Sequence, residues 1–188
     1  MLIHLSIELT RTQELERFWA PILQSFAAGE TVLPPYLGLG NAGFEALITD
    51  LAASHIELYI LPGQHKTPIR QVRQDIVNLR QSELQELVSL LMENANPSAC
   101  YARFAAMIIA CGCLGNRHLW KDLGLPERPR LSQIFAWYFP AIFSGNDRNM
   151  RWKRYLYKQL CETGGDYVCR APSCDQCNTY QECFGPET

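Results

Sequence analysis

Four cysteines lie within fifteen residues near the C-terminal end of the sequence, in the pattern C-x4-C-x2-C-x5-C. Thiolate sulfur is a ligand for zinc and iron–sulfur clusters rather than for magnesium or calcium. The two-residue gap lets one tight turn present two thiolates to the same centre, and Pro172 and Pro186 stiffen the surrounding chain. The pattern therefore predicts a metal or cluster site formed by Cys169, Cys174, Cys177 and Cys183.

The spacing favours an iron–sulfur cluster over zinc. Structural zinc sites often combine two separated short knuckles, whereas this segment contains a single C-x2-C. Uneven spacing within one loop, with a Gly-Pro pair after the last cysteine, is more typical of a cluster site. A zinc-stabilised interaction module and disulfide bonding remain the alternatives.

Four further cysteines and one histidine have simpler explanations. Cys100, Cys111 and Cys113 fall in an apolar stretch, where cysteine behaves as a small hydrophobic residue. Cys161 could be an alternate ligand, although packing in the core is the commoner role. His118 could also bind a transition metal, but a lone histidine more often caps or packs a helix.

The elements that must position these residues are predicted to be helical. The expected helices span 14–28 (broken near Pro21), 44–53, 99–114 (capped by Ser98), 118–123 and 131–139. A further helix is expected to start at Ser82, in a capping box with Gln85. The last helix is expected to be capped by Asn146 or Asp147 and stopped by Gly164-Gly165. Residues 55–61 alternate like a strand that has no partner. The prediction is an all-α fold, a single helical domain closed by an irregular C-terminal cysteine-rich metal-binding loop.

The domain is expected to span residues 1–188. Residues 1–78 form a poorly interpretable N-terminal part, 79–164 a helical core, and 165–188 the cysteine-rich cluster-binding tail. The net charge of -2 gives no overall reason to expect a nucleic-acid partner. Charge is unevenly distributed, however: residues 117–158 hold nine Lys/Arg against three Asp/Glu, and residues 159–188 hold one against five.

No membrane or export segment is expected. The N-terminus has no basic n-region and carries Glu8 inside its apolar stretch. The most apolar run, 105–114, is about half the length needed to cross a bilayer. We therefore expect a cytoplasmic protein, in which reducing conditions favour metal ligation over disulfides.

Several motifs in order resemble the NifQ family of nitrogen-fixation proteins. They are the segment from Arg151 to Glu162, the cysteine run closing with Cys183-Phe-Gly-Pro-Glu187, His118-Leu-Trp-Lys-Asp-Leu-Gly-Leu125, the Phe139-Pro140 pair, and Leu79-Arg-Gln-Ser-Glu-Leu84. The resemblance covers about residues 79–187.

The resemblance implies a carrier of molybdenum rather than an enzyme. Members of this family hold a molybdenum–iron–sulfur cluster, and the family's cysteine motif corresponds to Cys169, Cys174, Cys177 and Cys183. The implied partners are molybdate or another molybdenum source, the nitrogenase cofactor-assembly scaffold and the nitrogenase iron protein. The implied role is supply of molybdenum for biosynthesis of the iron–molybdenum cofactor.

Arg151, Arg154 and Lys158 line one face of the last expected helix. They could attract anionic molybdate or offset the negative charge of a thiolate-ligated cluster, although a solvated helix face is the simpler interpretation.

An enzyme is the main alternative among cluster proteins. Helical DNA glycosylases also end in a four-cysteine cluster loop, and Leu61-Pro-Gly-Gln-His-Lys-Thr67 superficially resembles their hairpin. That hairpin needs a second glycine where Gln64-His65 stands, and no convincing catalytic Lys/Asp pair follows. No nucleophile–base pair or phosphate loop is recognisable either.

Overall fold

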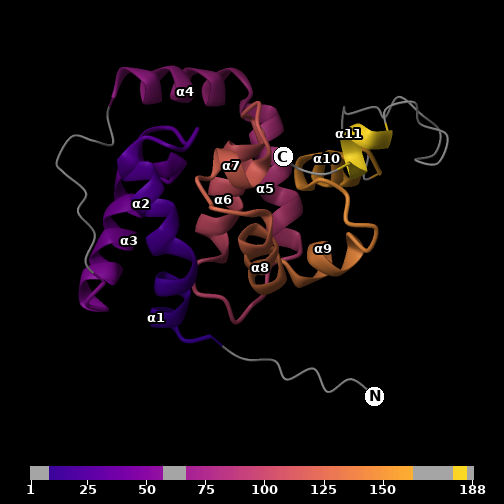
Figure 1. The fold of residues 1–188 in the computed structure, drawn as a ribbon. Coiled ribbons are helices and arrows are strands. Elements are labelled where there is room, and N and C mark those ends of the chain that lie inside the picture. Colours follow the sequence, from indigo (N-terminus) through magenta and orange to yellow (C-terminus); the bar gives the residue numbers. More distant parts are fainter. Residues whose placement is uncertain (1–8, 57–66, 163–179, 186–188) are drawn as a thin grey trace, which may run out of the picture.

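The computed structural model describes residues 9–56, 67–162 and 180–185. Every regular element within these ranges is helical (Figure 1), which confirms the all-α prediction for the described part of the chain. No helix among the described residues is both long and apolar enough to cross a membrane. The strand-like residues 57–61 and most of the cysteine-rich tail lie outside the described ranges.

The N-terminal part begins with one continuous helical rod. It consists of α1 (Arg11–Glu14), a π-helical turn η1 (Leu15–Trp19) and α2 (Ala20–Ala28). The predicted break near Pro21 is wrong, because the π turn ends at Trp19, α2 begins at Ala20, and Pro21 occupies the first turn of α2. A π turn accommodates a locally altered hydrogen-bond register, so the rod continues past a residue that lacks a backbone N–H.

A short 3-10 turn, η2 (Pro35–Gly38), leads into α3 (Gly40–Ala53), which contains the expected helix 44–53. The next two helices, α4 (Pro68–Leu79) and α5 (Gln81–Glu93), are separated by Arg80 alone. The predicted capping box at Ser82 is therefore wrong, because Arg80 is the N-cap of α5 and Ser82 already lies inside the helix. Helix α4, a largely polar helix with few buried residues, is not among the helices expected from the sequence.

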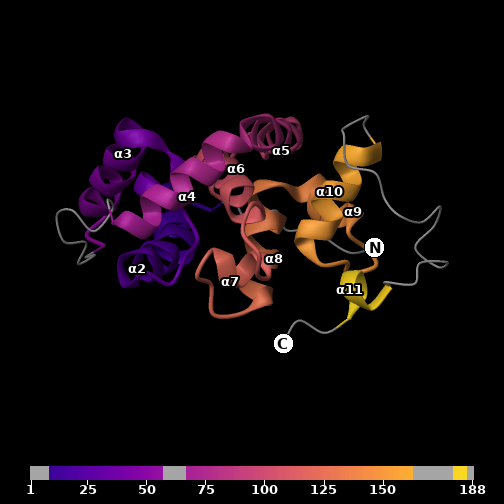
Figure 2. The ribbon, with the colours of Figure 1, turned by 90° about the horizontal axis from the view of Figure 1, so that it is seen from above.

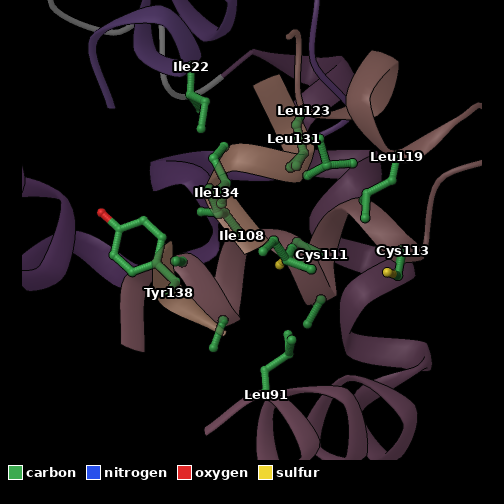
Figure 3. Packing of buried hydrophobic residues seen from close by; sticks show 14 of the residues in the cluster. Ile22, Leu91, Ile108, Cys111, Cys113, Leu119, Leu123, Leu131, Ile134 and Tyr138 are labelled. Atoms are coloured by element: carbon green, nitrogen blue, oxygen red, sulfur yellow. The ribbon is translucent and has the colours of Figure 1, made fainter. Parts of the chain in front are cut away.

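The helix α6 (Ala102–Cys113) lies at the centre of the core, as its apolar composition predicts. Figure 3 shows its Ile108 and Cys111 among Leu91, Leu131 and Ile134 from neighbouring helices. The expected cap at Ser98 is wrong, because α6 starts at Ala102 and its N-cap residue is Tyr101. Instead the buried carboxylate of Glu14 in α1 accepts hydrogen bonds from the N–H groups of Cys100 and Tyr101, at 2.9 and 3.4 Å.

The described C-terminal half contains two longer helices, α8 (Arg128–Tyr138) and α10 (Trp152–Glu162), and three short ones, α7 (Leu119–Asp122), α9 (Pro140–Gly145) and α11 (Tyr180–Phe184). Helices α7 and α8 confirm the helices expected at 118–123 and 131–139. Trp152, Tyr155, Leu156 and Leu160 are buried, as the apolar stripe of α10 predicts.

The cap expected for α10 at Asn146 or Asp147 is wrong, because the helix starts at Trp152. The Asn146 side chain instead closes the preceding turn. Its Oδ1 accepts from the N–H of Met150 and its Nδ2 donates to the carbonyl of Met150, both at 2.8 Å. Gly164 and Gly165, the predicted stop, lie outside the described residues.

Candidate functional site

Of the four predicted ligands, Cys183 falls in the described part of the chain, and Cys169, Cys174 and Cys177 lie outside it. Cys183 is half-buried in α11, and its carbonyl accepts a hydrogen bond from the N–H of Arg151 at 2.7 Å. The next residue, Phe184, has its ring 5.2 Å from the guanidinium carbon of Arg148. These contacts hold α11 at the N-terminal end of α10 (Figure 2).

The cysteines of α6 belong to the hydrophobic core. Cys111 and Cys113 are buried (Figure 3), and burial raises the pKa of each thiol to about 12. A metal ligand must be a thiolate, so the raised pKa makes metal binding by either thiol more costly than for an ordinary cysteine. This confirms their predicted role as small hydrophobic residues.

The two remaining cysteines differ from that pair. Cys100 is exposed and precedes α6, so its predicted place among the buried residues of that helix is wrong. Cys161 is half-buried near the end of α10, and its alternative role as a ligand stays a prediction. The described residues contain no cluster of three or more His, Cys, Asp or Glu side chains that could hold a metal ion.

A basic cavity of about 510 Å³ lies beside this end of α10. It is formed by the turn before α7, by α7 itself, and by one residue of α8 and the start of α10. Figure 1 shows these helices in the C-terminal half of the molecule. The lining residues are Asn116, Arg117, His118, Leu119, Lys121, Leu131, Arg151, Trp152, Lys153 and Arg154.

The structure separates the three basic residues predicted on α10. Arg151 and Arg154 line the basic cavity, whereas Lys158 does not and instead pairs with Glu162 at 3.3 Å. His118 also lines the cavity and is the N-cap residue of α7. The structure thus brings two of the predicted basic residues together with His118, from segments more than thirty residues apart.

A buried carboxylate beneath the cavity was not predicted. Asp122 is fully buried, and its Oδ1 accepts from Nε of Arg117 at 3.0 Å. Its Oδ2 accepts from the backbone N–H of Arg117 at 3.2 Å and from Nζ of Lys153. Asp122 therefore joins the turn before α7 to α10 and fixes two cationic residues of the cavity wall.

The cavity has three further cationic residues that were not predicted as site residues: Arg117, Lys121 and Lys153. The available signal was the excess of nine basic over three acidic residues in 117–158. That excess indicates a basic site somewhere in the segment. The face of a single helix does not give its members, because the cavity is lined by residues from α7, α8 and α10 and from the turn before α7.

A second polar cluster fixes α10 against α5. The Tyr157 hydroxyl donates to Oε1 of Glu83, which also pairs with Arg80 at 2.5 Å. Arg80 in turn donates to the carbonyl of Leu114 at 3.2 Å. Burial raises the pKa of Tyr157 well above its ordinary value, so the phenol remains a hydrogen-bond donor at physiological pH.

Comparison with known proteins identifies the family. The NifQ family model matches residues 18–185. Protein NifQ of Azotobacter vinelandii is 38% identical over 167 residues, covering 88% of this chain and 86% of the relative. Protein NifQ of Rhodobacter capsulatus is 36% identical, with 88% and 84% covered. Protein NifQ of Klebsiella pneumoniae is 31% identical, with 90% and 96% covered. No solved structure matches the chain.

The residues matched by the family model include all four predicted ligands and the residues that line the basic cavity. The chain therefore belongs to the NifQ family.

Proposed function

We propose that this protein is a non-enzymatic carrier that supplies molybdenum for biosynthesis of the iron–molybdenum cofactor of nitrogenase. In this proposal the cargo is a molybdenum–iron–sulfur cluster held by Cys169, Cys174, Cys177 and Cys183. The receiving partners are the cofactor-assembly scaffold and the nitrogenase iron protein. The observation that carries the proposal is membership of the NifQ family over residues 18–185, a range that contains the whole cysteine motif.

The chemistry of the cysteines supports this choice of site. The buried thiols of Cys111 and Cys113 have raised pKa values and are poor ligands, whereas Cys183 is half-buried in a short helix outside the core helices. A carrier must hold its metal and also release it. Ligands on a terminal segment meet both needs more readily than ligands inside a packed core.

The charge around Cys183 supports the same site. Four thiolates give a cluster a net negative charge, and this charge influences the stability of the bound state. The Arg151 N–H donates to the Cys183 carbonyl, and the Arg151 and Arg154 side chains line the adjoining basic cavity. Cations beside the cluster segment would offset part of its negative charge.

The test is metal analysis and an absorption spectrum on one anaerobic sample purified from nitrogen-fixing cells. We expect iron and molybdenum together in the wild type, with both metals lost when Cys174 and Cys177 are changed to Ala. The matched control is Cys100→Ser, which alters an exposed cysteine outside the motif and should keep both metals. Circular dichroism of each variant checks that the helical domain is intact.

Two outcomes of the metal analysis would contradict the proposal. Stoichiometric zinc without iron, in a colourless wild-type protein, would favour the zinc-stabilised interaction module. Iron and molybdenum unaffected by the double cysteine substitution would place the cluster elsewhere. A molybdenum-transfer assay to the cofactor-assembly scaffold then tests donation itself, and failure of a fully loaded protein to transfer molybdenum would exclude the carrier role.

A further inference from the structure

The turn between α9 and α10, residues 146–151, is closed by hydrogen bonds within it. Asn146 is 9% exposed, and its side chain binds both backbone groups of Met150, the N–H through Oδ1 and the carbonyl through Nδ2. The Asn149 N–H donates to the Asn146 carbonyl at 3.0 Å. Asn149 has a positive φ of +56°, a conformation in which asparagine is enriched among residues other than glycine. The turn therefore keeps a defined backbone shape without belonging to either helix.

Contacts outside the turn fix it to the rest of the domain. Arg128, at the first position of α8, donates to the carbonyls of Asn149 and Met150, at 3.1 and 2.8 Å. The Met150 side chain is buried and belongs to the hydrophobic core. Because the turn is bonded to α8 and packed into the core, its surface groups are fixed points for a segment that lies against it.

The segment that lies against this turn is α11, which carries Cys183. The Arg151 N–H donates to the Cys183 carbonyl at 2.7 Å, and the Arg148 guanidinium carbon lies 5.2 Å from the centre of the Phe184 ring. Cys183 and Phe184 are partly buried against the hydrophobic core. Figure 1 shows α11 beside α10. One backbone bond, one ring contact and packing against the core therefore hold two consecutive residues of α11 on the turn.

The Arg148 contact is the part of this attachment that a side-chain substitution can remove. The Arg151 bond joins two backbone groups, so it survives any change of side chain except proline. Arg148 is exposed, so its substitution does not open the core. A cation over an aromatic ring at an exposed site shifts an equilibrium by about two- to fivefold. That effect is large enough to change how often α11 leaves the turn, and too small to unfold the domain.

We propose that Arg148 is a positioning residue for Cys183, and that the turn 146–151 holds this ligand in place before a metal binds. The contacts involved are made by protein groups alone, so they do not require a bound metal. The inference rests on the proposed function, because it takes Cys183 as a ligand. A ligand that is already held loses less conformational freedom when the metal binds, which makes the bound state longer-lived.

The first experiment measures how firmly the turn holds α11 in the metal-free full chain. The rate at which N-ethylmaleimide labels Cys183 reports how often α11 opens. The buried Cys111 and Cys113 stay in place, and the other cysteines are replaced: Cys100→Ser, Cys161→Ser, Cys169→Ser, Cys174→Ser and Cys177→Ser. We expect Arg148→Gln and Phe184→Leu each to raise the labelling rate about two- to fivefold. Arg148→Lys should stay near the parent rate, because it keeps a cation over the ring.

Two controls isolate the contact. Asp147→Asn changes an exposed residue of the same turn and should leave the labelling rate unchanged. The double variant Arg148→Gln, Phe184→Leu should label no faster than the faster single variant, because both substitutions remove the same contact. A parent rate in Arg148→Gln, or a double variant whose factor is the product of the two single factors, would overturn the proposal. Circular dichroism checks that each variant keeps its helices.

The second experiment separates this inference from the proposed function. Protein with all its cysteines is loaded with iron, and loss of iron to bathophenanthroline is followed by absorbance. We expect Arg148→Gln to begin with the wild-type iron content and to lose it about two- to fivefold faster, with Arg148→Lys close to the wild type. Equal rates of iron loss in Arg148→Gln and the wild type would overturn the positioning role and leave the carrier intact. Faster labelling of Arg148→Gln, together with a wild type that never acquires iron, would contradict the proposed function and still support the hold of the turn on Cys183.

Discussion

At the scale of single residues, Asp122 is the side chain on which the basic cavity depends most directly. Its carboxylate is fully buried and is bonded by Arg117 and Lys153, two residues that come from the turn before α7 and from α10. A buried ion pair contributes modestly to stability when complete, because desolvation offsets the attraction between the charges. Breaking one is much more harmful, since the surviving charge stays buried.

The first prediction therefore concerns Asp122→Asn. The amide keeps the size of the side chain but removes its charge, which leaves the Lys153 ammonium without its counter-ion at 16% exposure. We expect a loss of about 3 kcal/mol in the free energy of unfolding, measured by urea titration. Glu162→Gln removes the partner of an exposed pair with Lys158 and should cost less than about 0.5 kcal/mol. Equal effects of the two substitutions would contradict the role given to Asp122.

At the scale of elements, the N-terminal rod and the central helix α6 are joined by one carboxylate. Glu14 is fully buried and accepts from the N–H groups of Cys100 and Tyr101 at the start of α6. It also accepts from the Tyr138 hydroxyl of α8 at 2.7 Å, and that hydroxyl accepts from the indole N–H of Trp19 at 3.0 Å. One side chain thus replaces the missing local cap and connects three helices.

The second prediction is that Glu14→Gln destabilises the fold by about 2 kcal/mol. The amide replaces one acceptor oxygen by a donor that faces other donors, and hydrogen bonds to a charged acceptor contribute about 1.5–3 kcal/mol. Glu16→Gln, two residues away on the exposed side of the rod, is the control and should have almost no effect. Chemical denaturation measures both. A stable Glu14→Gln protein would show that α6 does not need this cap.

The third prediction concerns the end of α7, where Gly124 has a positive φ of +72°. A Cβ there would collide with Cβ of Ser25 in α2 and lie 2.8 Å from Cγ2 of Thr31. Gly29 has a similar φ of +80° but nothing within 4 Å. Gly29→Ala should therefore cost about 1 kcal/mol, the strain of the left-handed backbone alone, and Gly124→Ala at least about 2 kcal/mol more. Equal losses in thermal unfolding would show that the close approach of α7 to α2 is unimportant.

The same elements show which features could be predicted from sequence. The helix α6 and the stripe of α10 were predictable because apolar residues recur there at helical spacing. The caps at Ser82, Ser98 and Asn146 were not, because each cap depends on where a neighbouring element ends. The cap of α6 comes from Glu14, more than eighty residues earlier. Helix α4 does carry apolar residues at helical spacing, at Ile69, Val72, Ile76 and Leu79, but Ile69, Val72 and Leu79 are exposed rather than buried in the core.

The candidate site also has one part that could be predicted from sequence and one part that could not. The cysteine motif is local in sequence, so its spacing alone is enough to predict a metal or cluster site. The basic cavity is assembled from residues 116–119, Lys121, Leu131 and residues 151–154. A single helical face reveals Arg151 and Arg154, but Arg117, Lys121 and Lys153 join them only through the packing of α7 against α8 and α10. An excess of positive charge in a segment indicates that a basic site exists but does not show which residues line it.

At the scale of the whole molecule, the core contains several groups that ionise only at high pH. Burial raises the pKa of Cys111 and Cys113 from 9.0 to about 12 and that of Tyr101 from 10.0 to about 12. It raises the pKa of Tyr138 and Tyr157 further still. All five keep their protons in the folded state at a pH where the unfolded chain has begun to release them.

The sign of the resulting pH dependence follows from linkage. Well below pH 9.0 the two thiols are protonated in both states and do not affect the slope. Between 9.0 and about 12 the folded state binds more protons than the unfolded state, so the free energy of unfolding falls as pH rises. Each thiol contributes a slope approaching about 1.4 kcal/mol per pH unit in that window.

The fourth prediction is that the alkaline slope becomes shallower when Cys111 and Cys113 are both changed to Ala. Urea titrations of the metal-free protein at intervals above pH 9 measure it. The variant will have a different stability at pH 7, because two buried side chains are smaller, but the change of slope isolates the thiols. Ile109→Val, a buried substitution that removes no ionisable group, should shift the curve without changing its slope. Parallel curves for the cysteine variant and the wild type would mean that the two thiols ionise alike in the folded and unfolded chain, and would remove the reason for excluding them as thiolate ligands.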